Sequence, residues 1–351
     1  MVISRTPLRL SFFGGGTDYP AWFRAHGGEV LATTIDKYCY LTCRYLPPFF
    51  EHRIRIIYSK IENCQTIDEI AHPAAREVLR YLDVRRGVEI HHDADLPARS
   101  GMGTSSAFTV GLLNAVHALK GEMRTKHALA SEAIDIEQNI IREAVGSQDQ
   151  VLAAYGGFNH ILFLPNDSFV VNPVTLLPAR MAEFNSHLML FYTGIRRTAS
   201  DVARTFVDNL ESRRRQLRTM THLVHEALNI LTSGGPITGI GELLHEAWEA
   251  KRSLSSSISS SEIDSIYETA RSAGAIGGKL AGAGGGGFLL LFVPPERQAQ
   301  VRAALGKLTY VPFRFEFSGS QIIFYDLEQE YEDVDAAECE RRAREFRERR
   351  P

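Results

Sequence analysis

The sequence predicts a globular chain of mixed helices and strands, divided into about two domains. Its 351 residues exceed the roughly 150 residues of a typical domain. Its composition of 44% apolar and 23% charged residues is close to the average of globular proteins and allows a sizeable core. Segments with strand-like alternation are interspersed with segments of helical periodicity. These observations disfavour a disordered chain and a fixed-period repeat protein.

The first half of the chain carries both kinds of segment. Alternating apolar and polar residues predict strands, and apolar residues that recur every three or four positions predict helices. From Thr125 such an apolar stripe continues to Val145, and Gly146 is placed to end that helix. The predicted strands are Val2–Phe13, Gly28–Leu46, Val88–Asp93 and His160–Leu164, and the predicted helices are Ser105–Leu119 and Thr125–Val145.

A proline-punctuated stretch then divides the chain, and we place a domain boundary near residue 185. The N-terminal domain would span residues 1–185 and the C-terminal domain residues 186–326, followed by a tail, 327–351, in which 15 of 25 residues are charged. We expect this tail to be a solvated helix or a partner-binding segment. The remaining predicted helices are Ala199–Leu231, Ile240–Lys251, Glu262–Ala273 and Glu296–Leu305, and the remaining strands are Leu188–Tyr192, Phe288–Val293, Tyr310–Phe317 and Gln321–Tyr325.

Charge and apolar patterning exclude several classes of protein. The net charge of −3 lacks the basic excess typical of nucleic-acid-binding proteins, so we expect no nucleic-acid partner. The longest apolar stretch, Phe288–Val293, is far below the roughly 20 residues that cross a bilayer, and the N-terminus does not resemble a secretory signal. Four cysteines make no disulfide framework. We therefore expect a cytoplasmic protein without a membrane partner, and the sequence leaves monomer and homodimer open.

Chemistry-bearing residues gather in three glycine-rich loops. In the first loop, Gly14–Gly16 follows a predicted strand, and consecutive glycines allow a ligand or another chain to approach the backbone closely. The second loop, Leu96–Ala107, leads into a predicted helix, and the third, Gly277–Gly287, precedes a predicted strand. Each loop taken alone also fits an ordinary turn or helix cap, so a functional interpretation requires all three loops together.

The second loop predicts an anion-binding site. At a helix N-terminus, unpaired backbone N–H groups and the positive end of the helix dipole face a ligand. Thr104, Ser105 and Ser106 add hydroxyl groups there, although such residues also serve as plain N-caps. The third loop contains a formal G-x-G-x-x-G, but it opens a strand instead of a helix, which argues against a Rossmann site. No Walker sequence, G-x-x-x-x-G-K-[ST], is present.

In their order and spacing, the three loops together resemble the three motifs of the GHMP kinases. Pro7–Tyr19 resembles the first motif, Pro97–Ala107 the phosphate-binding loop and Lys279–Gly287 the third motif, and the resemblance spans about residues 5 to 325. It implies an α+β fold of two domains, the first like ribosomal protein S5 domain 2 and the second ferredoxin-like, with the active site in the cleft between them. It also implies small-molecule substrates, with ATP as phosphate donor and Mg²⁺ as cofactor.

The resemblance assigns roles on the phosphate side of this site. Ser105 matches the family's magnesium-binding serine, and Glu137, among apolar neighbours, is the candidate carboxylate ligand unless it is a solvated helix residue. Asp149 matches the catalytic aspartate, as general base or hydroxyl-orienting group, with a local helix cap as the alternative. Arg9 matches the first-motif arginine expected beside Asp149. Residues expected at the ATP phosphates are Pro97, Ser100, Gly101, Met102, Gly103, Thr104, Ser105 and Ser106.

On the acceptor side, Asp18 matches the acidic residue expected to bind sugar hydroxyls. The other residues expected to contact the substrate are Gly15, Gly16, Gly284, Gly285, Arg196 and Arg197. Phe13–Pro20 and Tyr192–Ser200 are similar to the family branch that phosphorylates the C1 hydroxyl of D-glycero-D-manno-heptose 7-phosphate, for nucleotide-heptose synthesis.

A buried 7-phosphate would need paired cations. Arg196 and Arg197 are the leading candidates for them, with Lys251 and Arg252 as alternatives. A kinase for another sugar such as fucose, and a non-catalytic sugar and ATP sensor on the same fold, are the alternative functions.

Overall fold

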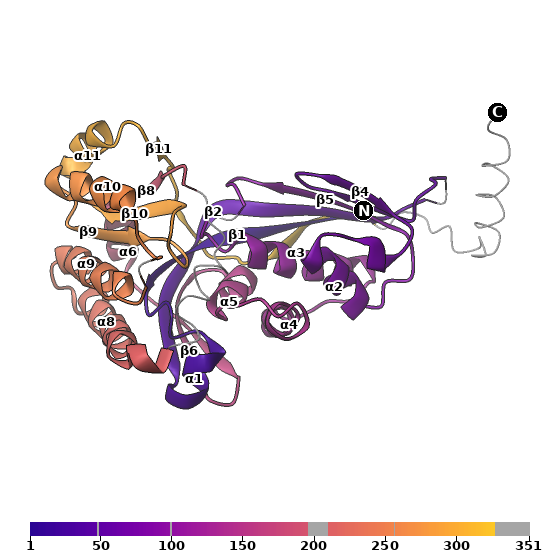
Figure 1. Ribbon diagram of the computed structural model, residues 1–351, viewed down its shortest axis with the longest axis horizontal. Helices are drawn as coiled ribbons and strands as arrows, with labels where there is room; N and C mark the ends of the chain where they lie inside the picture. The colour runs from indigo at the N-terminus through magenta and orange to yellow at the C-terminus, as the bar shows by residue number, and fades with distance from the viewer. Residues whose placement is uncertain (48, 99, 196–209, 256, 327–351) are drawn as a thin grey trace.

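A computed structural model describes residues 1–47, 49–98, 100–195, 210–255 and 257–326. The predicted tail, 327–351, and the predicted phosphate-binding residues Arg196 and Arg197 lie outside these ranges. The described chain forms two β-sheets that lie one after the other along the longest axis, each packed against helices (Figure 1). Two apolar cores accompany the two sheets, and Trp22 from the first part of the chain belongs to the second core.

The larger sheet is built on the antiparallel pair β1 (Val2–Phe13) and β2 (Gly28–Tyr45). Its strand order is β13-β1-β2-β5-β3-β4, and β6, β7 and β12 join through β2 and β6. The pattern of alternation predicted β1, β2 and β5 correctly because these strands are long and half-buried or buried. The other strands of this sheet are β3 (Ile54–Ile57), β4 (Ile61–Cys64), β5 (Val88–Ala94), β6 (Phe158–Phe163), β7 (Phe169–Pro173), β12 (Phe315–Glu316) and β13 (Gln321–Tyr325).

Helices cover one face of this sheet (Figure 1). The central one, α3 (Thr104–Leu119), packs on β1 and β2 and is buried on nearly all sides. The N-terminal end of α3 carries the second glycine-rich loop, so this packing fixes that loop relative to β1. The neighbouring helices are α2 (Pro73–Tyr81), α4 (Lys126–Asp135) and α5 (Gln148–Tyr155), and α1 (Pro20–His26) follows the first loop.

The prediction of one helix over Thr125–Val145 is wrong for the second half of that range. After α4 the chain forms a π-helical turn at Ile136–Ile140, in which the Ile141 N–H donates to the Ile136 carbonyl at 2.8 Å. Arg142 then adopts a left-handed φ of 62° and ends the helical run, so Gly146 is not the helix-ending residue. An apolar stripe does not reveal such a change of helical period, and π turns are frequent at functional sites.

The smaller sheet is antiparallel, in the order β11-β8-β10-β9. One of its two inner strands, β10 (Phe288–Phe292), is fully buried, as its continuous apolar run predicted. The other strands are β8 (Leu188–Tyr192), β9 (Gly277–Leu280) and β11 (Thr309–Tyr310), and the helices of this part are α6 (Pro178–Ser186), α8 (Arg214–Ser233), α9 (Thr238–Arg252), α10 (Ser261–Ser272) and α11 (Gln298–Ala304). None of the helices within the described ranges is both long and apolar enough to span a bilayer.

The end of the described chain returns to the larger sheet. The sequence predicts one strand over Tyr310–Phe317, but the structure has β11 in the smaller sheet and β12 paired with β2. The last strand, β13, pairs with β1. An aromatic cluster supports this return, because the Phe12 ring lies 5.8 Å from Phe158, 5.1 Å from Phe184 and 6.1 Å from Phe315, measured between centroids.

Replacing Phe12 with alanine should destabilise the protein by about 3–5 kcal/mol, because it opens a cavity at the buried ring that contacts the other three members of the cluster. Urea unfolding followed by tryptophan fluorescence measures this change. Phe49→Ala is the matched control: Phe49 is 71% exposed, so its loss should cost no more than about 0.5 kcal/mol. Equal effects of the two variants would contradict the assignment of the cluster as a structural centre.

Candidate active site

A bidentate ion pair between Arg9 and Asp149 lies at the centre of the site. Arg9 Nε donates to Asp149 Oδ1 at 2.6 Å, and Nη2 donates to Oδ2 at 2.7 Å. Arg9 comes from β1, and Asp149 from the first turn of α5, whose N-cap residue is Ser147. The arginine side chain is 6% exposed and that of the aspartate 23%. Asp149 is therefore not a helix cap, and the structure joins the two residues expected to be catalytic.

The phosphate-binding loop lies directly beside this pair. Arg9 Nη1 donates to the Gly101 carbonyl at 2.6 Å, and the Arg9 backbone N–H donates to the Met102 carbonyl at 3.1 Å. The N-cap residue of α3 is Gly103, and no described side chain caps this N-terminus. The first turn of α3 thus offers its N–H groups and positive dipole end to an anion next to Arg9.

The third glycine-rich loop packs backbone to backbone on the second. A Cβ built on Gly101 would lie 2.6 Å from the Ala281 carbonyl oxygen, and one built on Gly287 would lie 2.1 Å from the Ser100 carbonyl oxygen. Gly284 and Gly285, predicted to contact substrate, lie against Ile258, whose carbonyl accepts from the Gly285 N–H at 2.8 Å. The third loop therefore supports the phosphate-binding loop.

Glu137 points into the interior and is 1% exposed, so it is not a solvated helix residue. Its Oε2 accepts from Ser106 Oγ at 2.9 Å and from Gln150 Nε2 at 2.5 Å. Burial raises the pKa of Glu137 to about 7. Its Oε1 is buried with no hydrogen-bond partner among the described residues. The structure joins this carboxylate to Ser106, whereas the predicted partner, Ser105, is exposed on the first turn of α3.

The first loop buries Asp18, which is 1% exposed. Its Oδ1 accepts from the Gly16 N–H at 2.9 Å and its Oδ2 from the Gln148 N–H at 3.4 Å. Burial raises the pKa of the Asp18 carboxyl, these backbone hydrogen bonds oppose the rise, and the charge of Asp149 adds to it. A Cβ on Gly15 would lie 3.6 Å from the Gln148 side chain. The first loop and the start of α5 thus form one unit beside Asp149.

Two buried lysines complete the site, and the sequence assigned a role to only one of them, as an alternative phosphate ligand. Lys251, at the end of α9, is 8% exposed, and Lys279, in β9, is 5% exposed. The sequence spacing could have predicted the burial of Lys251, because Leu244, Trp248 and Lys251 share the buried face of one helix. Arg252, the other alternative, pairs with Glu249 at 2.9 Å and Asp264 at 3.0 Å.

Pro97 lies half-buried in the connection between β5 and α3, and Met102 is fully buried beneath the loop. Ser100 is 3% exposed, and its Oγ has no hydrogen-bond partner within the described ranges. Pro97, Ser100 and Met102 thus support the loop or line its base, whereas Gly103 is the N-cap residue of α3 and Thr104, Ser105 and Ser106 form its first turn.

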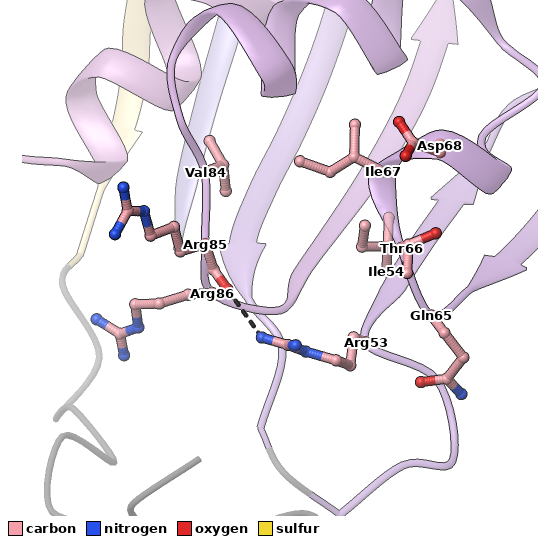
Figure 2. A pocket seen from close by; sticks show the side chains of 9 residues that line it. All are labelled: Arg53, Ile54, Gln65, Thr66, Ile67, Asp68, Val84, Arg85 and Arg86. Carbon is pink, nitrogen blue, oxygen red and sulfur yellow. Dashed lines mark hydrogen bonds between the residues drawn. The ribbon is translucent and has the colours of Figure 1, made fainter.

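A pocket of about 240 Å³ lies at the far end of the larger sheet, where Arg53, Arg85 and Arg86 contribute to its wall (Figure 2). Arg53 donates to the Arg85 carbonyl at 2.8 Å, Arg85 pairs with Asp83 at 2.8 Å, and the Arg86 guanidinium lies 3.9 Å from the centre of the Tyr45 ring. Along β2, Tyr45 is eleven residues from Thr34, which pairs with Arg9, roughly 36 Å of extended strand. These arginines have local partners, and the pocket is separate from the site.

An uncapped helix N-terminus, a buried carboxylate with a hydroxyl partner and an arginine–aspartate pair fit the positioning and charge neutralisation that phosphoryl transfer requires. Two family models agree: "GHMP kinases N terminal domain" matches residues 69–157, and "GHMP kinases C terminal" matches residues 225–311. The chain belongs to the GHMP kinase family and is a phosphotransferase, with ATP as the phosphate donor expected for that family.

Several relatives resemble most of this chain. The D-glycero-alpha-D-manno-heptose 7-phosphate kinase of Campylobacter jejuni is 28% identical over 87% of this chain and 93% of its own length. The L-fucokinase/L-fucose-1-P guanylyltransferase of Bacteroides fragilis is 26% identical over 86% of this chain, which spans only 35% of that relative. The crystal structure of a D-glycero-D-manno-heptose 1-phosphate kinase from Bacteroides thetaiotaomicron matches with a TM-score of 0.75 and 26% identity, over 93% of this chain and 100% of the other.

Replacing Gly101 with alanine should weaken binding of a non-hydrolysable ATP analogue by at least about 10-fold, a loss of 1.4 kcal/mol. The added methyl group collides with the Ala281 carbonyl and displaces the loop. Isothermal titration calorimetry measures the effect.

Gly121→Ala is the matched control for this variant. Gly121 has a similar φ of 75°, against 80° for Gly101, but a Cβ there meets nothing within 4 Å. The similar positive φ gives both variants comparable backbone strain, so only Gly101→Ala should lose affinity for the analogue. A normal affinity in Gly101→Ala would exclude this loop as the nucleotide site.

Proposed function

We propose that this protein is a cytoplasmic sugar kinase that transfers the γ-phosphate of ATP to the C1 hydroxyl of D-glycero-D-manno-heptose 7-phosphate. The product would be heptose 1,7-bisphosphate, a precursor for nucleotide-heptose synthesis. The observation that carries the catalytic proposal is the Arg9–Asp149 pair beside the N-terminus of α3. The sugar is supported by the heptose 7-phosphate kinase that resembles 87% of this chain.

The phosphate side of the site fits ATP and Mg²⁺. Backbone N–H groups from Gly101 to Ser106 would bind the phosphate oxygens, as helix N-termini do. Glu137 would hold the magnesium ion, with a hydroxyl of Ser106 or Ser105, because its buried Oε1 has no described protein partner and Mg²⁺ prefers such oxygen ligands. When bound, the ion supplies neutralisation of phosphate charge. Gln150 and Ser106 fix the carboxylate for this role.

The acceptor hydroxyl would bind at Asp149. In the transfer, the bond between the acceptor oxygen and the γ-phosphorus forms, and the bond from that phosphorus to the ADP oxygen breaks. The hydroxyl proton passes to Asp149 or to water, and the aspartate orients the hydroxyl in either case. Arg9 holds Asp149 through two hydrogen bonds, which fixes both carboxylate oxygens before the substrate binds. Asp18 would accept hydrogen bonds from other sugar hydroxyls, with Gly15 and Gly16 beside it.

Asp149→Asn should lower kcat by at least about 100-fold, the lower range for loss of a positioned acid or base, because the amide cannot accept the proton and pairs poorly with Arg9. The affinity for an ATP analogue should stay close to that of the wild type. A coupled ADP-release assay and calorimetry measure the two quantities.

The control for this variant is Asp68→Asn. Asp68 forms an exposed ion pair with Arg80 at 2.6 Å, so its loss should leave kcat unchanged. Near-normal turnover of Asp149→Asn would remove the catalytic assignment of Asp149.

A substrate panel tests the sugar. We expect kcat/KM for heptose 7-phosphate to exceed the values for free heptose and fucose by at least about 100-fold, because a site built to bind a polar group rejects analogues that lack it. Phosphorus NMR of the product should show a new phosphate at C1. The similarity to an L-fucokinase makes fucose the second candidate, and a preference for fucose would replace the heptose proposal.

A further inference from the structure

Two lysine ammonium groups are buried at the site with few partners. Lys251 Nζ donates to the Gly282 carbonyl, and Lys279 Nζ donates to the Phe12 carbonyl at 2.9 Å. An ammonium has three N–H donors, and each of these lysines bonds to one backbone oxygen. In the described part of the chain, no carboxylate lies within 4.0 Å of either nitrogen, although the side chains are 8% and 5% exposed. Buried cations without a counterion are costly.

Lys251 is attached to the phosphate-binding loop through the backbone of the third loop. Its hydrogen-bond acceptor belongs to Gly282, and a Cβ on Gly282 would lie 2.6 Å from Cα of Gly101. The Gly101 carbonyl in turn accepts from Arg9 Nη1. Arg9 and the Lys251 ammonium therefore hold two glycines that are in direct contact with each other.

The charged groups around Lys251 form no ion pair with it in the described part of the chain. They come from β1, the first loop, α5 and β9, and are Arg9, Asp18, Asp149 and Lys279. Arg9 and Asp149 neutralise each other by their bidentate contact. Of the other two groups, burial lowers the pKa of Lys279 well below its usual value and raises the pKa of Asp18, so Asp18 does not supply a firm counterion to Lys251. Burial and, to a smaller extent, the charge of Arg9 lower the pKa of Lys251 to about 8, while Asp18 and Asp149 oppose the change. A bound polyanion would supply the missing charge.

We propose that Lys251 is a further catalytic residue, whose ammonium binds the oxygens of the γ-phosphoryl group while that group passes from ADP to the acceptor. This inference rests on the proposed phosphoryl transfer at Arg9 and Asp149 and does not depend on which sugar is the acceptor. Lys251 keeps all its protons during the step, and the acceptor's proton leaves as described above. Lys251 lies beside the phosphate-binding loop. This position is why we assign its ammonium to the transferred phosphate and not to a phosphate already present on the sugar.

Lys251→Met tests the proposal, because methionine keeps the apolar stem and removes the charge. We expect kcat to fall by at least about 100-fold, as for loss of one charge-stabilising donor, with the sugar KM and the affinity for an ATP analogue within about 3-fold of wild type. The thermal midpoint should equal or exceed that of the wild type. Because the pKa of Lys251 is lower in the folded protein, burial of its charge reduces the free energy of unfolding at neutral pH. The variant removes this destabilising contribution.

Lys307→Met is the control, since Lys307 is exposed, and it should leave kcat, KM and the thermal midpoint unchanged. The variants are assayed with the best acceptor of the substrate panel, so failure of the heptose assignment leaves this test intact. An increase confined to KM of a phosphorylated sugar would overturn the proposal and move Lys251 to that phosphate. A kcat near the wild-type value, or loss of activity that accompanies a lowered thermal midpoint, would also overturn it.

Discussion

The Arg9 guanidinium is the group on which the geometry of the site depends. All three of its nitrogens are used: Nε and Nη2 hold Asp149, and Nη1 holds the Gly101 carbonyl. One planar cation thereby fixes the start of α5 and the loop before α3 relative to β1. Because guanidinium donors are coplanar, a displacement of either segment would break one set of bonds. A lysine at this position could not make the same three contacts.

Close backbone contacts extend this constraint to the second part of the chain. The loop that contains Gly282 and Gly287 meets Gly101 and Ser100 without intervening side chains. Gly286 adds a contact to Ile195, and the Gly287 N–H donates to the Ile195 carbonyl at 2.8 Å. The smaller sheet is thus held against the phosphate-binding loop by main-chain atoms, which leave less freedom of adjustment than flexible side chains would.

Much of the fold could be predicted from the sequence because its main elements are long and strongly patterned. The strands β1, β2 and β10 and the helix α3 are examples. Short, partly exposed strands such as β3 and β4 carry too few residues for a clear pattern. The π turn after α4 could not be predicted, since an α-helix and a π turn bury similar residues. The strand β12 belongs to the larger sheet through pairing with β2 across about 280 positions, which no local signal encodes.

In the site, too, some residues could be predicted from the sequence and others could not. The motifs brought Arg9 and Asp149 together although they are 140 residues apart. The motif could not show whether Ser105 or Ser106 contacts Glu137. Neighbouring hydroxyls on one helical turn point in different directions, and the one that faces Glu137 depends on how α4 and the π turn pack against α3. Lys279 received no role because its burial depends on the pairing of β9 with β10 and on the approach of β1.

The pairing of β13 with β1 places the two ends of the described chain in one sheet. During synthesis β1 leaves the ribosome long before its partner β13, which follows only after residues 188–311, the span that carries the strands of the smaller sheet. The larger sheet therefore cannot acquire its full set of strands as a nascent N-terminal unit. During synthesis, the edge of β1 that pairs with β13 must stay unpaired until β13 has been made, and exposed strand edges are vulnerable to association in that period.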